Sequence, residues 1–294
     1  MTFIIHADME LWDFMLNGLK DRKDVKDFPL NRYCNRFHRF LRSYFPYLVA
    51  PSIFFIGEEI RRELKSLVPG DKVIISAYTQ PCLFNAIKNS VKDGVQICLW
   101  MWNPISSNSI FVKNLELLRK EGVSLHTFDT KDSIDYSMVY HNTFYNMNVD
   151  SYSSKIEYDF YFLGAAKKRR DEIDKVRKEL NNFRCNFLIP SSTNDYITYE
   201  KNLSYIRESN CIVEIVQNKQ YDITLRPLEA LAFKKKLLTN NHHIKRYPFY
   251  NKQNIFILGE DNINLIGDFL DTPFVEIDGE IVKQFDINTW IDSF

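Results

Sequence analysis

The chain has 294 residues, 45% of them hydrophobic and 15% aromatic, which is enough apolar material for two cores of ordinary size. Its 38 basic and 38 acidic residues cancel, so the composition argues against a broad nucleic-acid-binding surface, and we expect no nucleic-acid partner. Asp8 and Glu10 interrupt the apolar start too early for a signal peptide, and no apolar run reaches about 18 residues. We therefore expect a cytoplasmic protein without a spanning helix, whose five cysteines are reduced.

The first half of the chain alternates between short apolar runs and amphipathic segments, which is typical of a parallel sheet covered by helices. Residues 21–27 interrupt this pattern with a charged stretch, which we interpret as a loop or a solvated helix face. The expected strands are residues 3–7, 72–77, 95–101 and 124–128, and the expected helices are residues 83–91 and 111–120.

A second alternation follows a polar segment at residues 146–154, which lacks periodicity and is the best candidate for a linker. The expected strands of this half are residues 160–164, 186–189, 211–216 and 255–258, with a helix ending near residue 180. The sequence thus predicts an α/β protein with a first lobe at residues 1–148, a second lobe at residues 149–275 and a C-terminal segment at residues 276–294.

The stretch at residues 205–241 reads as strand, polar loop, helix and strand. Pro227 is tolerated only in a first helical turn, so the helix is expected to begin at Thr224 or Leu225. At 100° per residue, the leucines of this helix share one face, whereas Arg226 and Glu229 point away from the core. Ligands gather at such positions in open α/β sheets.

The segment LRPLEALAFKKKLLTNN at residues 225–241 resembles the nucleotide-sugar-binding half of GT-B glycosyltransferases, in particular the CgeB-like and lipopolysaccharide or capsule biosynthesis group. Residues 99–104, 158–170 and 250–259 resemble the same group. Asp222 departs from the pattern, because a small glycine is common there. The matching positions are Gln220, Thr224, Arg226, Glu229, Ala230, Leu231, Lys235 and Asn241.

This resemblance implies two Rossmann-like lobes of GT-B type, with parallel sheets facing a central cleft and residues 276–294 returning toward the first lobe. It implies transfer of a sugar from a nucleotide-sugar donor to a hydroxyl of a bacterial surface polysaccharide, with a glycan or lipid-linked glycan as acceptor. We expect no cofactor and no metal, and a peripheral contact with the cytoplasmic face of the inner membrane. Two alternatives stay open: another nucleotide-sugar enzyme such as an epimerase, and a non-catalytic binding protein.

A small-residue turn at Gly164 leads into four consecutive basic residues. Backbone N–H groups at a helix start favour phosphate, and the resemblance implies that Lys167 and Arg169 meet the donor diphosphate. Alternatively, the helix begins near Asp171 and the cations form a solvated loop.

Arg226 and Glu229 form the second candidate group. The resemblance assigns Glu229 to the ribose and makes phosphate the plausible ligand of Arg226, which would also stabilise the leaving group in catalysis. The alternative is an ion pair on a wet helix face, worth about 0.2–0.5 kcal/mol. Gln220 and Thr224, in the preceding loop, are further candidates for donor binding.

An inverting transferase needs a general base, which should follow a strand of the first lobe. Asp8, Glu10 and Asp135 are weak candidates, and a retaining enzyme has no need of one. The Asp129-x-x-Asp132 spacing differs from a metal-binding D-x-D, and we interpret it as a solvated turn.

Residues 31–47 are basic and aromatic, and no acidic residue occurs from Asn31 to Gly57. On a helix, Phe37, Phe40 and Tyr44 would share one face, and arginines would occupy the other. Such a helix could lie in an anionic membrane interface, or it could be an ordinary amphipathic helix with its aromatics in the core. The second interpretation is the expectation.

Overall fold

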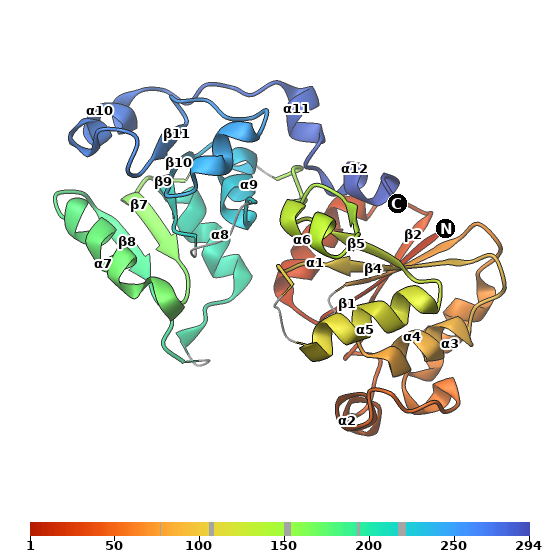
Figure 1. The fold of residues 1–294 in the computed structure, drawn as a ribbon. Helices are drawn as coiled ribbons and strands as arrows, with labels where there is room; N and C mark the ends of the chain where they lie inside the picture. Colours follow the sequence, from red (N-terminus) through yellow and green to blue (C-terminus); the bar gives the residue numbers. More distant parts are fainter. Residues whose placement is uncertain (77, 106–108, 150–153, 193–194, 217–221) are drawn as a thin grey trace. The chain divides into compact units, whose positions relative to one another are not determined.

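The computed structural model describes residues 1–76, 78–105, 109–149, 154–192, 195–216 and 222–294 (Figure 1). These residues form two compact units, Met1–His141 and Asn142–Phe294. The boundary between the units falls after His141, whereas the sequence placed it after residue 148. Residues 150–153 of the expected linker lie outside the described residues.

The first unit contains a six-stranded parallel sheet in the order β2-β1-β3-β4-β5-β6. Its buried apolar strands pack against flanking helices, as the alternating pattern predicts. The strands are β1 (Thr2–His6), β2 (Val25–Pro29), β3 (Lys72–Ser76), β4 (Gln96–Met101), β5 (Ser124–Thr127) and β6 (Val139–Tyr140). The helices are α1 (Glu10–Leu16), α2 (Arg36–Tyr44), α3 (Glu58–Ser66), α4 (Pro81–Lys88), α5 (Ser109–Lys120) and α6 (Thr130–Asp135).

Strand β2 corrects the interpretation of residues 21–27 as a loop or helix face. It pairs with β1 as the outermost strand, with Phe3 opposite Lys26. Its charged residues Lys26 and Asp27 are exposed, whereas Phe28 is buried. An outer strand can carry charges on its solvated side, and for this reason the charge pattern concealed it.

The second unit contains a five-stranded parallel sheet in the order β11-β10-β9-β7-β8. The predicted helix after the polar loop is present as α9, with Thr224 as its N-cap. The strands are β7 (Tyr158–Leu163), β8 (Cys185–Leu188), β9 (Ser209–Glu214), β10 (Lys236–Thr239) and β11 (Ile255–Ile257). The helices are α7 (Arg170–Glu179), α8 (Tyr199–Arg207), α9 (Leu225–Ala232), α10 (Ile266–Asp271), α11 (Gly279–Lys283) and α12 (Ile287–Asp292).

Both sheets confirm the predicted α/β class with two Rossmann-like units of parallel strands. In the second unit, β7 lies between β8 and β9, so the direction in which strands are added reverses at β7. The carboxyl ends of β7 and β9 therefore flank a topological switch point, where open α/β sheets bind ligands. In the first unit, β1 and β3 flank the equivalent point.

The C-terminal segment packs on the chain just after the unit boundary. The Tyr145 N–H donates to the Phe285 carbonyl at 2.8 Å, and the rings of Phe144 and Trp290 stack with centroids 4.0 Å apart. These contacts place the segment in the second unit. Its return toward the first lobe, like the central cleft, stays a prediction.

Candidate functional site

Helix α9 is tied to the carboxyl ends of β9 and β10 through a buried carboxylate. The Thr224 hydroxyl accepts from the Arg226 N–H at 3.1 Å and donates to Oε1 of Glu214 at 2.5 Å. The Thr239 hydroxyl donates to the other oxygen of Glu214 at 2.6 Å. Burial raises the pKa of Glu214, although both hydroxyls act in the opposite direction. Thr224, a predicted donor-binding residue, thus fixes the start of the helix.

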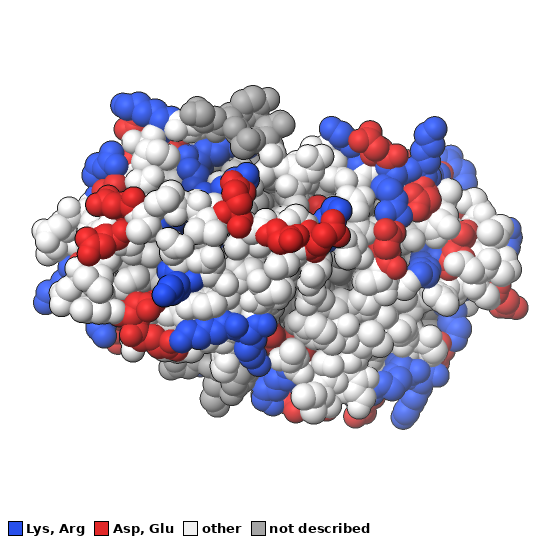
Figure 2. Space-filling view, turned by 90° about the horizontal axis from the view of Figure 1, so that it is seen from above, with Lys and Arg blue, Asp and Glu red and all other residues white. Residues whose placement is uncertain are grey.

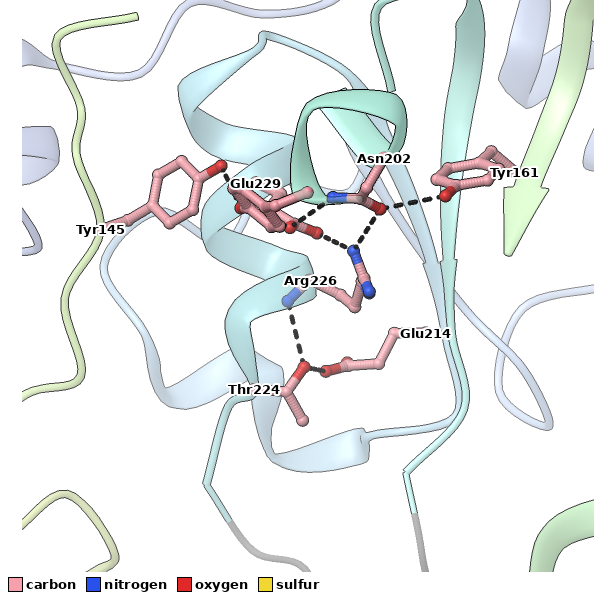
Figure 3. Close-up of polar contacts among 8 residues, drawn as sticks. Tyr145, Tyr161, Asn202, Glu214, Thr224, Arg226 and Glu229 are labelled. Atoms are coloured by element: carbon pink, nitrogen blue, oxygen red, sulfur yellow. Dashed lines mark hydrogen bonds and ion pairs between the residues drawn. The ribbon is translucent and has the colours of Figure 1, made fainter. Parts of the chain in front are cut away.

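Glu229 lies off the leucine face of α9, as the helical periodicity predicted, but that side of the helix is not open to solvent. Its side chain is only 1% exposed, because α8 covers this face of α9. Its Oε1 accepts from the Tyr199 hydroxyl at 2.9 Å and from the Asn202 amide at 3.2 Å, and its Oε2 pairs with Arg226 (Figure 3). The alternative of a wet surface ion pair is therefore wrong about the exposure, although the pair itself exists.

Arg226 is held on one side only. Its Nη1 donates to Glu229 and, at 3.2 Å, to Oδ1 of Asn202, which also accepts from the Tyr161 hydroxyl at 3.0 Å. Within the described parts of the chain, its Nε and Nη2 have no hydrogen-bond partner, and 21% of the side chain is exposed (Figure 3). Burial is the largest single effect and lowers the pKa of Arg226, but the Glu229 carboxylate, together with the nearby hydroxyl groups of Tyr161 and Tyr199, raises it on balance. The site thus presents a fixed positive charge with unused donors.

A second arginine lies at the same switch point. Arg169 ends a short 3-10 helix, Lys167–Arg169, that follows β7. Its Nε donates to the Ala165 carbonyl at 3.2 Å, and its Nη1 donates to the Ile215 carbonyl just beyond β9. Burial lowers the pKa of Arg169, and the nearby Arg226 lowers it further. Two like charges brought together repel each other and destabilise the protein locally, and a bound anion would relieve that repulsion.

The position of the Arg169 guanidinium depends on the absence of a side chain at Gly164. A Cβ added to Gly164 would lie 2.6 Å from Nη2 of Arg169, so any side chain there displaces the guanidinium. Helix α7 begins at Arg170, one residue before the alternative start near Asp171, and Lys167–Arg169 form a 3-10 turn just before it. The Lys167 side chain and all of Gln220 lie outside the described residues.

A cavity of about 690 Å³ opens at the carboxyl ends of β10 and β11, beside α7. Val216 lines it and follows Ile215, whose carbonyl accepts from Arg169, but neither Arg169 nor Arg226 is among the described residues that line the cavity. Asn241 also lines it; this residue is 2% exposed, and its amide nitrogen has no hydrogen-bond partner among the residues that the structure describes. A buried unpaired amide costs roughly 1–3 kcal/mol, which a ligand acceptor would recover.

The three candidate bases differ in whether they follow a strand of the first unit. Asp8 follows β1 at the switch point of the first unit and pairs with Arg32 at 2.7 Å. Glu10 is the first residue of α1. Asp135 ends α6 and forms an exposed ion pair with Lys131, so it does not lie at a strand end as expected.

The Asp129-x-x-Asp132 stretch is not a solvated turn, because both side chains are buried. Asp129 caps α6 by accepting from the Asp132 N–H at 2.9 Å. Asp132 accepts from the Ile105 N–H at 2.6 Å, and burial raises its pKa to about 6.

Sequence reasoning missed Tyr161, Tyr199 and Asn202. Tyr199, Asn202 and Ile206 stand at helical spacing along α8, so the amide of Asn202 interrupts an otherwise apolar stripe. That interruption was visible, but α8 itself was not predicted. Asp222, at the position where glycine is common, is buried and accepts from the Tyr247 hydroxyl at 2.9 Å.

No protein-family model matches the chain, and no curated protein matches it. A crystal structure described as a glycosyltransferase from Rickettsia africae ESF-5 is similar to it at 11% sequence identity and a TM-score of 0.49. The similarity covers 99% of this chain and 96% of that chain. With identity this low, the function has to be inferred from the chain's own side chains.

Proposed function

We propose that the chain is a glycosyltransferase that uses a nucleotide-sugar donor, as its sequence resemblance implies. The observation that carries this proposal is Arg226, whose guanidinium is fixed on one side by Glu229 and Asn202 and offers unused N–H groups on the other. Arg169 adds a second cation across the same switch point. Paired N–H groups of this kind suit the oxygens of a diphosphate.

In the proposed reaction, the bond between the sugar's anomeric carbon and the diphosphate oxygen breaks, and the diphosphate keeps the electron pair. The acceptor hydroxyl oxygen forms the new bond, and in an inverting reaction its proton passes to a base, for which we propose Asp8 because it follows β1 at the switch point of the first unit. Arg226, Arg169 and Lys167 would stabilise the negative charge on the leaving diphosphate by preorganised electrostatics, so we propose that the reaction needs no metal.

Glu229 serves two purposes in this proposal. An ionised carboxylate offers about four lone-pair sites, and Tyr199, Asn202 and Arg226 already use three of them. The remaining site is enough for one ribose hydroxyl, provided that a movement of α8 or of the Arg226 side chain uncovers the carboxylate, which is 1% exposed. We therefore propose that Glu229 binds one hydroxyl and also positions Arg226, while the unpaired amide of Asn241 meets a polar group of the donor in the cavity beside α7.

A thermal-shift screen against nucleoside diphosphates and nucleotide sugars tests the proposal. A ligand at 100 times its Kd stabilises the folded protein by about 2.7 kcal/mol, which is readily seen as a higher Tm. Arg226→Gln should abolish the shift, whereas Arg177→Gln, which removes an exposed arginine near the end of α7, should retain it. If no member of the panel raises the Tm of the wild-type protein, the proposal is wrong.

One observation favours a non-catalytic binding protein as the second candidate: Asp8, the best-placed base, is already paired with Arg32. Mass spectrometry of the wild-type protein with donor and acceptor glycans separates the two, since only an enzyme yields free nucleoside diphosphate. Release of a changed sugar nucleotide without acceptor would instead indicate an epimerase.

The proposed acceptor is a hydroxyl of a growing bacterial surface polysaccharide, such as lipopolysaccharide or capsule. A lipid-linked acceptor would bring the enzyme to the cytoplasmic face of the inner membrane as a peripheral protein. None of the helices in the described residues is long and apolar enough to cross a bilayer.

A further inference from the structure

Helix α2 and the segment that follows it expose an unusual number of large apolar side chains. The described chain has seventeen exposed large hydrophobic residues, and nine of them fall between residues 37 and 54, so they form a cluster and are not scattered singly. Each is at least 40% exposed. The nine, which we call the aromatic surface, are Phe37, Phe40, Tyr44, Phe45, Tyr47, Leu48, Val49, Ile53 and Phe54.

This exposure corrects the expectation that the aromatics of α2 lie in the core. Phe37, Phe40 and Tyr44 follow one face of the helix, and Tyr44 is 72% exposed. Ring contacts join the cluster: Phe40 lies 4.7 Å from Tyr44, and Phe37 lies 6.4 Å from Phe54. Figure 1 shows α2 at the periphery of the first unit, away from the sheet. The aromatic surface therefore faces solvent, and ring contacts link several of its members.

The inward side of α2 is held by a buried cation. Arg42 is 4% exposed and donates to the Phe55 carbonyl and, at 3.2 Å, to Oδ1 of Asn31. Asn35 caps the helix, accepting from the His38 N–H at 3.0 Å. Because these bonds fix which face turns outward, the aromatic surface is a stable feature of the fold.

Within residues 31–57, which contain the aromatic surface, every charged residue at neutral pH is an arginine. Arg36 and Arg39 are exposed and have no ion-pair partner among the residues described, whereas Arg32 is paired with Asp8. No acidic residue occurs from Asn31 to Gly57, and the next acids, Glu58 and Glu59, begin α3. On the face in Figure 2, by contrast, positive and negative side chains are interspersed.

We propose that the aromatic surface, with Arg36 and Arg39, docks on an anionic phospholipid bilayer. Exposed rings can enter the boundary between headgroups and acyl chains, and nearby arginines attract the negative lipids. A protein partner with an acidic apolar face would be a different occupant, and in that case the wild-type protein would not bind anionic vesicles. The identification of this bilayer as the inner bacterial membrane rests on the proposed function. Vesicle binding needs neither donor nor acceptor, so membrane docking and glycosyl transfer can each be disproved without the other.

Co-sedimentation of the full chain with vesicles provides the test. Vesicles of phosphatidylglycerol and phosphatidylcholine should bind the protein, pure phosphatidylcholine should bind it more weakly, and salt should release it. Removing a cation near a membrane surface costs about a factor of five in affinity, so Arg36→Gln with Arg39→Gln should weaken binding by roughly 10- to 30-fold. Phe40→Ser with Tyr44→Ser should weaken it at least about tenfold on both lipids.

Matched controls keep the outcome interpretable. Ile134→Ser with Val139→Ser removes two exposed apolar side chains elsewhere in the same unit and should leave vesicle binding unchanged. Circular dichroism should show all variants folded, since the substituted side chains are exposed. Wild-type protein that ignores anionic vesicles at low salt overturns the proposal. A dimer in light scattering that Phe40→Ser with Tyr44→Ser abolishes also overturns it, because the occupant would then be a second copy.

Discussion

Glu229→Gln separates the structural role of the buried ion pair from its role in ligand binding. The carboxylate accepts three hydrogen bonds, from Tyr199, Asn202 and Arg226. A glutamine oxygen can keep the bonds from Tyr199 and Asn202. Its NH₂ group then faces the Nη1 of Arg226, so two donors meet where an ion pair stood.

The expected cost follows from the burial. Removing one partner of a buried ion pair typically destabilises a protein by about 3–5 kcal/mol. Arg226 keeps 21% of its side chain exposed, and water relieves part of that penalty, so we expect about 2–4 kcal/mol. Arg226→Gln with Glu229→Gln removes both charges and should be less destabilised than the sum of the single variants, with a coupling of about 2 kcal/mol.

Urea unfolding read by hydrogen-exchange mass spectrometry measures this cost. Peptides covering α8 and α9 report the second unit separately from the first, which matters because two compact units need not unfold in one step. Calorimetry with the nucleoside diphosphate found in the screen measures the other role, for which loss of a hydrogen bond to a charged group predicts about 1.5–3 kcal/mol of weaker binding.

The two measurements can disagree, and each disagreement is informative. If the peptides of Glu229→Gln unfold within about 0.5 kcal/mol of wild type, the buried-pair reasoning is refuted. If stability falls but affinity per folded molecule is unchanged, Glu229 is a structural residue alone and does not contact the donor.

Three further predictions follow from the same contacts. Arg226→Ala should lower turnover by about 10²–10³, more than it lowers donor affinity, and activity should survive a chelator; loss restored by Mg²⁺ or Mn²⁺ would overturn the metal-free mechanism. Gly164→Ala should displace Arg169 and weaken diphosphate binding roughly tenfold in calorimetry, with a small stability change because the displaced atoms end a flexible side chain. Burial raises the pKa of Asp132 from 3.8 to about 6. The favourable contribution of this group to the free energy of unfolding is therefore fully present below pH 3.8 and is lost as the pH rises through 6. Between pH 4 and pH 7, the free energy of unfolding of Asp132→Asn should therefore rise by up to about 3 kcal/mol relative to that of the wild type. If urea unfolding shows the same pH dependence for both proteins, this prediction is wrong.

The sequence predicted the fold class because apolar strands and amphipathic helices have distinct periods. It also placed the start of α9 correctly, since Pro227 is compatible only with a first turn. It failed at β2, where an outer strand carries charges that resemble a loop. Periodicity describes one element at a time, so it is least informative where an element's environment is set by a distant one.

The same limitation explains the error at Glu229. Helical spacing correctly separated Glu229 from the leucine face of α9, but it could not show that a second helix covers the other face. The aromatics of α2 show the reverse case, because an amphipathic pattern there predicted a core face and the structure leaves that face in solvent. An amphipathic pattern tells which residues share a face, and only the tertiary structure tells what covers it.

The burial of Glu229 and a role for Arg226 in ligand binding support each other. A buried ion pair adds little net stability, because desolvation offsets most of the attraction, so stability alone is a weak reason for this one. A free arginine side chain loses about 2 kcal/mol of rotamer entropy when it is immobilised on a ligand. Here Glu229 and Asn202 have immobilised the guanidinium already, so that cost is met during folding. A charge fixed in advance, with N–H groups still unused, is what a site needs to stabilise an anion that forms during a reaction.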